Sequence, residues 1–363
     1  MKDIIVYIVC CILTIAITPL ISKISIKYGA VDKPNNRKMH DDVMPTLGGL
    51  SIFAAFFLGH LLFGYPHFQF KAILLGSIII VITGVVDDIF DLNPKMKILA
   101  QLLAATIVIF YGQLYLKTVD LPIVGTIKLS YLGYFITYLW IIGITNAINL
   151  IDGLDGLASG VSTITFITMY ILAIIKKDYF VMSYALILAG SSTGFLVYNF
   201  HPAKIFMGDT GALFLGYILS VLSLMGFKNA TFISFVVPIL LLGVPVFDTF
   251  FAIIRRKLRG QSFAQADKEH LHHLLMTTNA SQTKTVLIIY GISIIFSVVS
   301  VVYSLVSEEL GLMILIILFF LIEYIATRIG LLDRHFFPFS KIRTNLDEAT
   351  IIQNQKTITK DKN

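Results

Sequence analysis

Four short stretches of this sequence carry polar residues of the types that bind metal ions and phosphates. In chain order they are Asp87, Asp88 and Asp91 in VVDDIFD, Asn149, Asp152 and Asp155 in NLIDGLDG, Asp209 in FMGDTG, and His270, His272 and His273 in EHLHH. The first three stretches adjoin long apolar runs. A carboxylate in the middle of a membrane-spanning helix costs about 2.5–3.5 kcal/mol on insertion scales, so ionisable residues in such segments mark a functional site by default. The four stretches therefore predict a polar site at the edge of an apolar protein.

The acidic residues favour magnesium as the bound metal. Mg²⁺ is a hard ion that usually binds through one or two carboxylates together with substrate phosphates and water, and Mn²⁺ accepts the same oxygen ligands. Zinc is disfavoured because no cysteine accompanies the histidines. The histidines are therefore expected to donate hydrogen bonds to phosphate or sugar oxygens, and a solvated histidine-rich loop is the alternative.

Two of the stretches have a spacing that suits a phosphate. Asn149, Asp152 and Asp155 recur every three residues, which spreads them over about 120° of a helix and lets them face one cavity. Gly153 lowers the helix preference and lets a flat ligand approach the backbone. Asp209 precedes an apolar run, so it is expected near a helix N-terminus, where free N–H groups and the helix dipole favour phosphate. These features predict a site for a diphosphate and its magnesium ion.

The composition is that of a membrane protein. Hydrophobic residues make up 56% of the 363 residues and charged residues 14%, whereas a soluble domain carries roughly 25% charged residues. About eleven apolar runs reach or approach the roughly 20 residues of a spanning helix. They are residues 4–22, 47–64, 71–87, 97–116, 130–149, 156–175, 180–198, 210–226, 231–254, 285–306 and 311–330. We therefore predict an all-α, polytopic integral membrane protein with ten or eleven transmembrane helices.

The basic residues orient the predicted spans. Five Lys and Arg residues lie in 23–46, and others cluster at 95–97 and 255–259, whereas the opposite loops carry fewer. Because cytoplasmic loops are the basic ones, the N-terminus is expected outside and the C-terminus in the cytoplasm. The candidate site then falls on the cytoplasmic face of the cell membrane, in loops 23–46, 87–97, 149–156, 199–210 and 255–284. The net charge of +6 reflects this bias, so no nucleic-acid partner is expected.

No polar stretch is long enough to form a soluble domain. Residues 1–335 are expected to form a single transmembrane domain, and the polar, aperiodic segment 336–363 a flexible cytoplasmic tail. A retained first span fits the sequence better than a cleaved signal peptide, because the positive charges follow the apolar run. A homodimer is one possible assembly.

Two lysines are candidates for phosphate contacts. Lys97 lies nine residues beyond Asp88, and Lys38 precedes the segment MPTLGGL. Anchoring at the membrane surface is the alternative for Lys38, and it is the preferred interpretation of the basic cluster 255–259.

Taken together, the motifs resemble those of the polyprenyl-phosphate N-acetylhexosamine-1-phosphate transferases. DDIFD at 87–91, NAINLIDGLDGLASG at 146–160, FMGDTGAL at 206–213 and HLHH at 270–273 match that family in order, spacing and expected placement. The likeness covers roughly residues 1–330. The His-x-His-His form is similar to the branch that transfers GlcNAc-1-phosphate, and most of all to the Gram-positive enzymes that start wall teichoic acid synthesis.

The resemblance implies a reaction and a set of residue roles. Undecaprenyl phosphate and UDP-GlcNAc would give undecaprenyl-diphospho-GlcNAc and UMP, with Mg²⁺ as cofactor. The implied metal ligands are Asp209 and Asn149, the implied catalytic residues are Asp87, Asp88 and Asp209, and Lys97 and Lys38 would contact phosphate. The implied donor site comprises Asp152, Gly153, Leu154 and Asp155, with Phe206 stacking on the uracil and His270, His272 and His273 covering the diphosphate and sugar.

Alternatives remain at this point. The muramyl-pentapeptide branch of the same family typically has three consecutive histidines. An intramembrane prenyltransferase would use DDIFD as a DDxxD motif for magnesium and an isoprenyl diphosphate, but it leaves MGDTG and HLHH without a role. A transporter would place its acids near the bilayer midplane, often in repeat-related pairs, and no internal repeat is visible. The sequence also departs from the family at Ala266-Asp267-Lys268, where relatives often have Pro-Asp-Arg.

Overall fold

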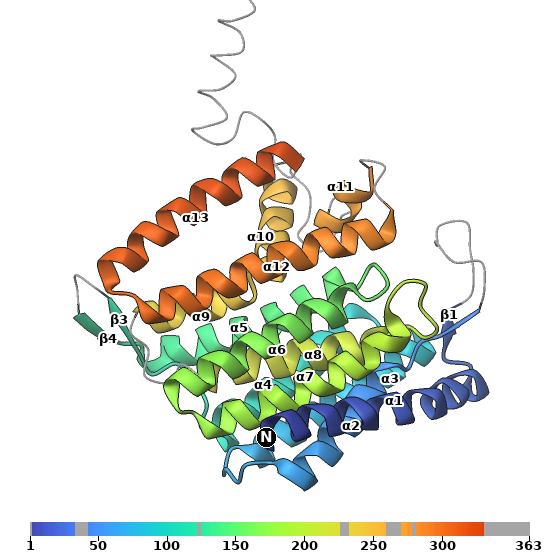
Figure 1. Ribbon diagram of the computed structural model, residues 1–363. Helices are drawn as coiled ribbons and strands as arrows, with labels where there is room; N and C mark the ends of the chain where they lie inside the picture. The colour runs from blue at the N-terminus through green and yellow to red at the C-terminus, as the bar shows by residue number, and fades with distance from the viewer. Residues whose placement is uncertain are drawn as a thin grey trace, which may run out of the picture.

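Long helices that run side by side dominate the computed structural model, which describes residues 2–32, 43–121, 125–225, 232–258, 270–277 and 281–329 (Figure 1). Within these ranges eight helices are long and apolar enough to cross a membrane. They are α1 (Lys2–Tyr28), α3 (Phe70–Phe90), α4 (Pro94–Thr106) with the π-helical turn Ile107–Tyr111, α5 (Ser130–Ile151), α6 (Leu157–Lys176), α7 (Tyr179–Asn199), α8 (Gly208–Met225) and α12 (Gln282–Leu305). The predicted all-α polytopic membrane protein is thereby confirmed.

Shorter elements complete the described chain. The other helices are α2 (Gly49–Phe63), α9 (Phe232–Leu241), α10 (Gly243–Leu258), α11 (Leu271–Thr277) and α13 (Glu308–Ile329). Two antiparallel hairpins pair β1 (Val31–Asp32) with β2 (Met44–Pro45) and β3 (Thr118–Leu121) with β4 (Gly125–Lys128). Figure 1 places β1 and α11 at one end of the helix bundle and the β3–β4 hairpin at the other.

Local sequence signals explain where several of these helices begin and end. Asp91 adopts a left-handed conformation with φ 54° and terminates α3, and its N–H donates to the Asp87 carbonyl. Asn93 then caps α4 by accepting the Lys95 N–H at 3.0 Å, and Pro94 occupies the first helical position, where its missing N–H costs nothing. The tight α3–α4 connection keeps the acids at 87–88 close to Lys97.

Helix α8 lies at the centre of the bundle. All of its residues from Thr210 to Met225 are buried, as expected for a helix that is apolar all round. Glycines of two neighbouring helices pack against its first turn. A Cβ at Gly84 of α3 would lie 2.4 Å from the Thr210 Cα, and one at Gly49 of α2 would lie within contact of the Gly211 backbone. Only glycine permits this close approach, so the first turn of α8 is held in place by its packing against α2 and α3.

The predicted continuous span 231–254 is wrong, because the chain forms two helices there. α9 ends at Leu241 and α10 begins at Gly243. Pro245 lies in the first turn of α10 and has no N–H to donate to Leu241, so the helical hydrogen-bond ladder is interrupted. Figure 1 shows α10 running across the direction of α9 and α12. The break turns α10 towards the segment that carries the histidines.

Candidate active site

The polar stretches predicted from the sequence meet around one cavity of about 610 Å³ at the end of the bundle that holds β1 and α11. Predicted residues that line it are Asp88, Asn149, Asp152, Gly153, Leu154, Asp155, Phe206, Asp209 and His273. Asp87, Lys97, His270 and His272 are not part of this lining, but Lys97 bonds to Asp209 and His272 packs on Gly153. Lys38 lies outside the described residues. Chain segments more than 100 residues apart therefore build a single site.

Asp88 joins α3 to the first turn of α8. Its carboxylate accepts hydrogen bonds from the Asp209 N–H at 2.9 Å, the Thr210 N–H at 3.1 Å and the Thr210 hydroxyl at 2.6 Å. These are among the N–H groups that a helix N-terminus leaves without partners. A carboxylate is also favoured there by the helix dipole. Asp88 thus fixes the position of the backbone that carries Asp209.

Asp209 is the meeting point of three other side chains. Lys97 donates to its Oδ2 at 2.5 Å, and the Asn149 amide donates to its Oδ1 at 3.0 Å. The same Lys97 ammonium lies 2.7 Å from Asp87, whose other oxygen accepts the Leu92 N–H at 2.8 Å. One cation therefore compensates two carboxylates of different helices. The predicted location of Asp209 at a helix N-terminus is confirmed, since α8 begins at Gly208.

The turn between α5 and α6 differs from the helix assumed for residues 149–155. α5 ends at Ile151, Asp152 is its C-cap, and α6 begins only at Leu157 after Gly156 with φ 76°. The three polar side chains nevertheless line the same cavity, because the turn wraps around it. Burial, and then the charges of the neighbouring carboxylates, raise the pKa of Asp152 well above its ordinary value. Ionisation of the Asp152 carboxyl group is therefore disfavoured in the folded protein.

Asp155 holds the loop that precedes α8. Its Oδ2 accepts the Ala203 N–H at 3.2 Å and lies 2.8 Å from the Nδ1 of His201. His201 is partly exposed and also lines the cavity. The sequence reasoning missed His201. The signal that could have found it is its place in the short polar loop directly before FMGD.

The histidine segment covers the α5–α6 turn. His272 is buried, and a Cβ at Gly153 would lie 2.4 Å from its Nε2, so the imidazole packs directly on the glycine. Burial lowers the pKa of His272 to about 4, and the neighbouring His273 adds to this shift. His272 is therefore a neutral imidazole at pH 7. His273 is exposed and faces the cavity.

A second residue that the sequence reasoning missed anchors these histidines. The Oδ2 of Asp248 on α10 lies 2.9 Å from the Nδ1 of His270, and its Oδ1 accepts the Leu271 N–H at 2.8 Å. The signal was present, since Asp248 is a carboxylate inside the apolar run 231–254 and such residues are expected to be functional.

The donor set around Asp209 fits magnesium. Asp209, Asn149 and Asp87 offer hard carboxylate and amide oxygens, the ligand type that suits Mg²⁺. Within the ranges that the structure describes, no three His, Cys, Asp or Glu residues converge as a metal cage. An ion here would complete its shell with water and substrate phosphate, which is how Mg²⁺ usually binds. Lys97 also compensates the charge of Asp87 and Asp209.

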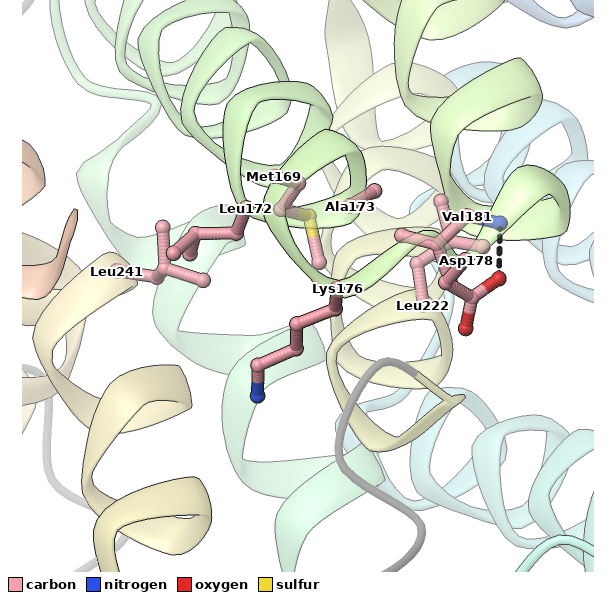
Figure 2. A pocket seen from close by; sticks show the side chains of 8 residues that line it. All are labelled: Met169, Leu172, Ala173, Lys176, Asp178, Val181, Leu222 and Leu241. Carbon is pink, nitrogen blue, oxygen red and sulfur yellow. Dashed lines mark hydrogen bonds between the residues drawn. The ribbon is translucent and has the colours of Figure 1, made fainter. Parts of the chain in front are cut away.

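A much smaller pocket lies at the opposite ends of α6 and α7 (Figure 2). Its lining is Met169, Leu172, Ala173, Lys176, Asp178, Val181, Leu222 and Leu241. Asp178 is the N-cap of α7 and accepts the Val181 N–H at 3.0 Å, as the dashed line in Figure 2 shows. With its carboxylate used as a cap and an otherwise mostly apolar lining, this pocket does not suit a diphosphate.

Comparison with known proteins connects this geometry to a family. Residues 70–227 match the model of glycosyl transferase family 4. This range spans α3 to α8, and so includes DDIFD, the α5–α6 turn and FMGD. A Bacillus subtilis protein described as a probable undecaprenyl-phosphate N-acetylglucosaminyl 1-phosphate transferase is 45% identical over 348 residues, which are 95% of this chain and 97% of that protein. The chain belongs to glycosyl transferase family 4.

More distant relatives of this family extend the likeness. The Salmonella typhi undecaprenyl-phosphate alpha-N-acetylglucosaminyl 1-phosphate transferase is 31% identical over 85% of this chain and 87% of its own length. The Mycolicibacterium smegmatis decaprenyl-phosphate N-acetylglucosaminephosphotransferase is 31% identical over 77% of this chain and 76% of its own length. Each of these glycosyl transferase family 4 relatives is named for a polyprenyl phosphate and an N-acetylglucosamine group.

Proposed function

We propose that this protein transfers GlcNAc-1-phosphate from UDP-GlcNAc to undecaprenyl phosphate, giving undecaprenyl-diphospho-GlcNAc and UMP. The observation that carries the proposal is the convergence of Asp209, Asp87, Lys97 and Asn149 at the N-terminus of α8, beside one cavity at the end of an apolar bundle. The printed names of relatives that match along most of the chain support the same activity.

The place of the cavity suits a reaction between a lipid and a nucleotide. The acceptor's polyprenyl chain must stay in the bilayer while its phosphate meets a water-soluble donor, so the site has to lie at the membrane surface. The excess of basic residues in 23–46 and 255–259 favours the cytoplasmic face of the plasma membrane. The product would be the first lipid-linked intermediate of wall teichoic acid or of a related cell-surface polymer.

The chemistry needs charge neutralisation more than a strong base. The second pKa of a phosphate monoester is about 6, so the acceptor is mostly dianionic at pH 7 and is itself the nucleophile. It attacks the β-phosphorus of the donor in line, and UMP leaves. In such transfers the protein mainly positions the reacting groups and stabilises their charge. Asp209 and Asn149 would hold Mg²⁺, which neutralises the diphosphate when it is bound.

The two adjacent aspartates are suited to different tasks. Both oxygens of Asp88 accept hydrogen bonds from the first turn of α8, so Asp88 positions Asp209. Asp87 shares the Lys97 ammonium, and it is the better candidate to orient the acceptor or to take its residual proton. Lys97 would then face the transferred phosphate, whereas the Asp209 and Thr210 N–H groups, expected from the sequence to favour phosphate, already donate to Asp88. The turn 152–156, Phe206 and the histidines would bind the donor.

The decisive experiment uses purified protein with undecaprenyl phosphate and Mg²⁺. UDP-GlcNAc, UDP-GalNAc and UDP-MurNAc-pentapeptide are offered separately, and UMP release is measured. We expect release with UDP-GlcNAc and strict dependence on the acceptor. Release with UDP-MurNAc-pentapeptide alone would place the protein in the other branch, and activity only on an isoprenyl diphosphate would refute the transferase.

The same assay separates a one-step from a two-step transfer. Attack by the acceptor in a single ternary complex requires that no UMP forms when undecaprenyl phosphate is left out. UMP formed without acceptor, in an amount equal to the enzyme, would instead show that an aspartate is the nucleophile.

A further inference from the structure

Asp248 is an almost completely buried carboxylate within α10. Its side chain is 1% exposed and that of His270 is 5% exposed. Both oxygens are used, one by the His270 Nδ1 at 2.9 Å and the other by the Leu271 N–H at 2.8 Å. Burying a carboxylate is costly unless it is paired and hydrogen-bonded. The Asp248 carboxylate meets this condition, and both of its hydrogen bonds go to the histidine segment.

The contact determines how the first histidine is presented. A carboxylate only accepts hydrogen bonds, so the proton on His270 must be at Nδ1, and Nε2 is left for another partner. The His270 ring lies parallel to that of His272, with centroids 6.0 Å apart and planes 3° apart. The Asp248 bond to the Leu271 N–H fixes the backbone between the two rings. A displacement of Asp248 therefore moves both rings together.

The histidine rings in turn reach the cavity. His272 packs on Gly153, and its Nε2 is buried without a hydrogen-bond partner. The His273 ring lies 4.2 Å from that of His272 and lines the cavity. Buried polar atoms without partners are rare in folded proteins and call for an explanation. An oxygen of a bound substrate near the α5–α6 turn would supply the missing partner.

We propose that Asp248 is a positioning residue for the donor substrate, a nucleoside-diphosphate sugar. By holding His270 and the start of α11, it sets the place of His272 and His273 over the turn 152–156. The break between α9 and α10 gives Asp248 this task, because it brings a residue of an apolar segment beneath the histidine segment. The inference rests on the proposed transferase function.

The test is a double-mutant cycle with Asp248→Asn, His270→Gln and the double variant, assayed by UMP release. Changing the partner that orients a metal-ligating histidine typically costs about 10–100-fold in activity, and we expect the same order for the partner that orients this histidine segment. We expect each single variant to lose 10–100-fold in kcat, with the KM for undecaprenyl phosphate unchanged. The double variant should be no slower than the slower single variant, because both changes break the same contact. If Asp248 only stabilised the fold, its substitution would not lower kcat at an unchanged KM for undecaprenyl phosphate. The losses of the two single variants would also not overlap in the double variant.

Asp178→Asn provides the matched control. It makes the same substitution in a carboxylate that accepts a backbone N–H at a helix start, and Asp178 lies between α6 and α7, at the ends of these helices away from the cavity. Its kinetics should stay within twofold of those of the unmodified protein.

Two results would overturn the inference. They are an Asp248→Asn variant within threefold of the unmodified protein, and a double variant whose loss equals the product of the single losses. If Asp248→Asn does not yield folded protein, His270→Gln still decides, because it leaves the bond to the Leu271 N–H in place and must lower kcat. Absence of UMP release by the unmodified protein would refute the proposed function instead.

Discussion

Replacing Gly153 with alanine probes the contact between the α5–α6 turn and the histidine segment. The added methyl group would lie 2.4 Å from the His272 Nε2, whereas ordinary contacts begin at 3.4 Å. The side chain or the turn must therefore move by about 1 Å, the difference between these two values. Gly153 is not among the glycines with positive φ, so alanine fits the backbone and the whole effect comes from the contact.

A shift of this size should be visible in catalysis. Misplacement of groups by about 1 Å in an active site can cost about 10²-fold in rate, which corresponds to about 2.7 kcal/mol in the activation free energy. We expect Gly153→Ala to lower kcat for UMP release by about 10²-fold. The KM for undecaprenyl phosphate should stay unchanged, because the acceptor is expected on the Asp87 side of the cavity.

Gly143→Ala is the control for this experiment. Gly143 lies in the middle of α5, and a Cβ there would meet nothing within 4 Å. Alanine is favoured over glycine in a helix by about 1 kcal/mol, so the variant should keep full activity and its unfolding temperature should not fall. If the kcat of Gly153→Ala were within threefold of that of Gly143→Ala, the packing of His272 on this turn would not matter for catalysis.

Four further predictions test other parts of the site. Asp209→Asn should abolish UMP release while the protein remains folded in the membrane; near-normal turnover would remove the metal assignment. Lys97→Met should lower kcat by at least about 10²-fold, since one preorganised charge contact is worth that much. It should also lower the unfolding temperature in EDTA; an unchanged temperature would contradict the shared-cation account. Because the raised pKa of Asp152 makes the folded state hold a proton that the unfolded state has lost, stability falls as the pH rises. Asp152→Asn should therefore stabilise the metal-free protein increasingly from acidic pH to pH 8, and a constant effect in thermal unfolding would argue against this. His201→Ala and Asp155→Asn should each raise the KM for UDP-GlcNAc about tenfold, the value of one charge-assisted hydrogen bond, and additive losses in the double variant would separate the two residues.

Hydropathy predicted most of the helices because a helix needs about 20 mostly apolar residues to cross a membrane. The bounds of α3, α5 and α7 agree with the predicted runs to within a few residues. The span 231–254 failed because its hydropathy is uninterrupted. The break depends on the missing N–H of Pro245, which an average over the window does not detect.

The polar stretches were identifiable from the sequence, but not all their contacts were. Asp209 could be placed at a helix N-terminus because GDTG precedes an apolar run. The bonds from Asp88 to that helix, across 121 and 122 residues of sequence, depend on how α3 packs on α8. Local sequence does not encode that packing. The helical spacing considered for residues 149–155 does not apply beyond Ile151, because α5 ends there with Asp152 as its C-cap.

The two missed residues illustrate different limits. Asp248 stood out as a lone acid in an apolar run, so burial cost alone could have singled it out. His201 had only a weak signal, its place in the polar loop before FMGD, since a histidine in a polar loop is ordinary. Its interest comes only from Asp155, a partner 46 residues away that the fold brings to 2.8 Å.

The close packing of glycines against the start of α8 holds one wall of the cavity in place. With Gly49 and Gly84 pressed against the first turn of α8, that helix has no room to slide or rotate. On another side of the cavity, the histidine segment is held to α10 by the Asp248 carboxylate. The Asp209 side of the cavity is therefore expected to keep its shape when a nucleotide enters or leaves.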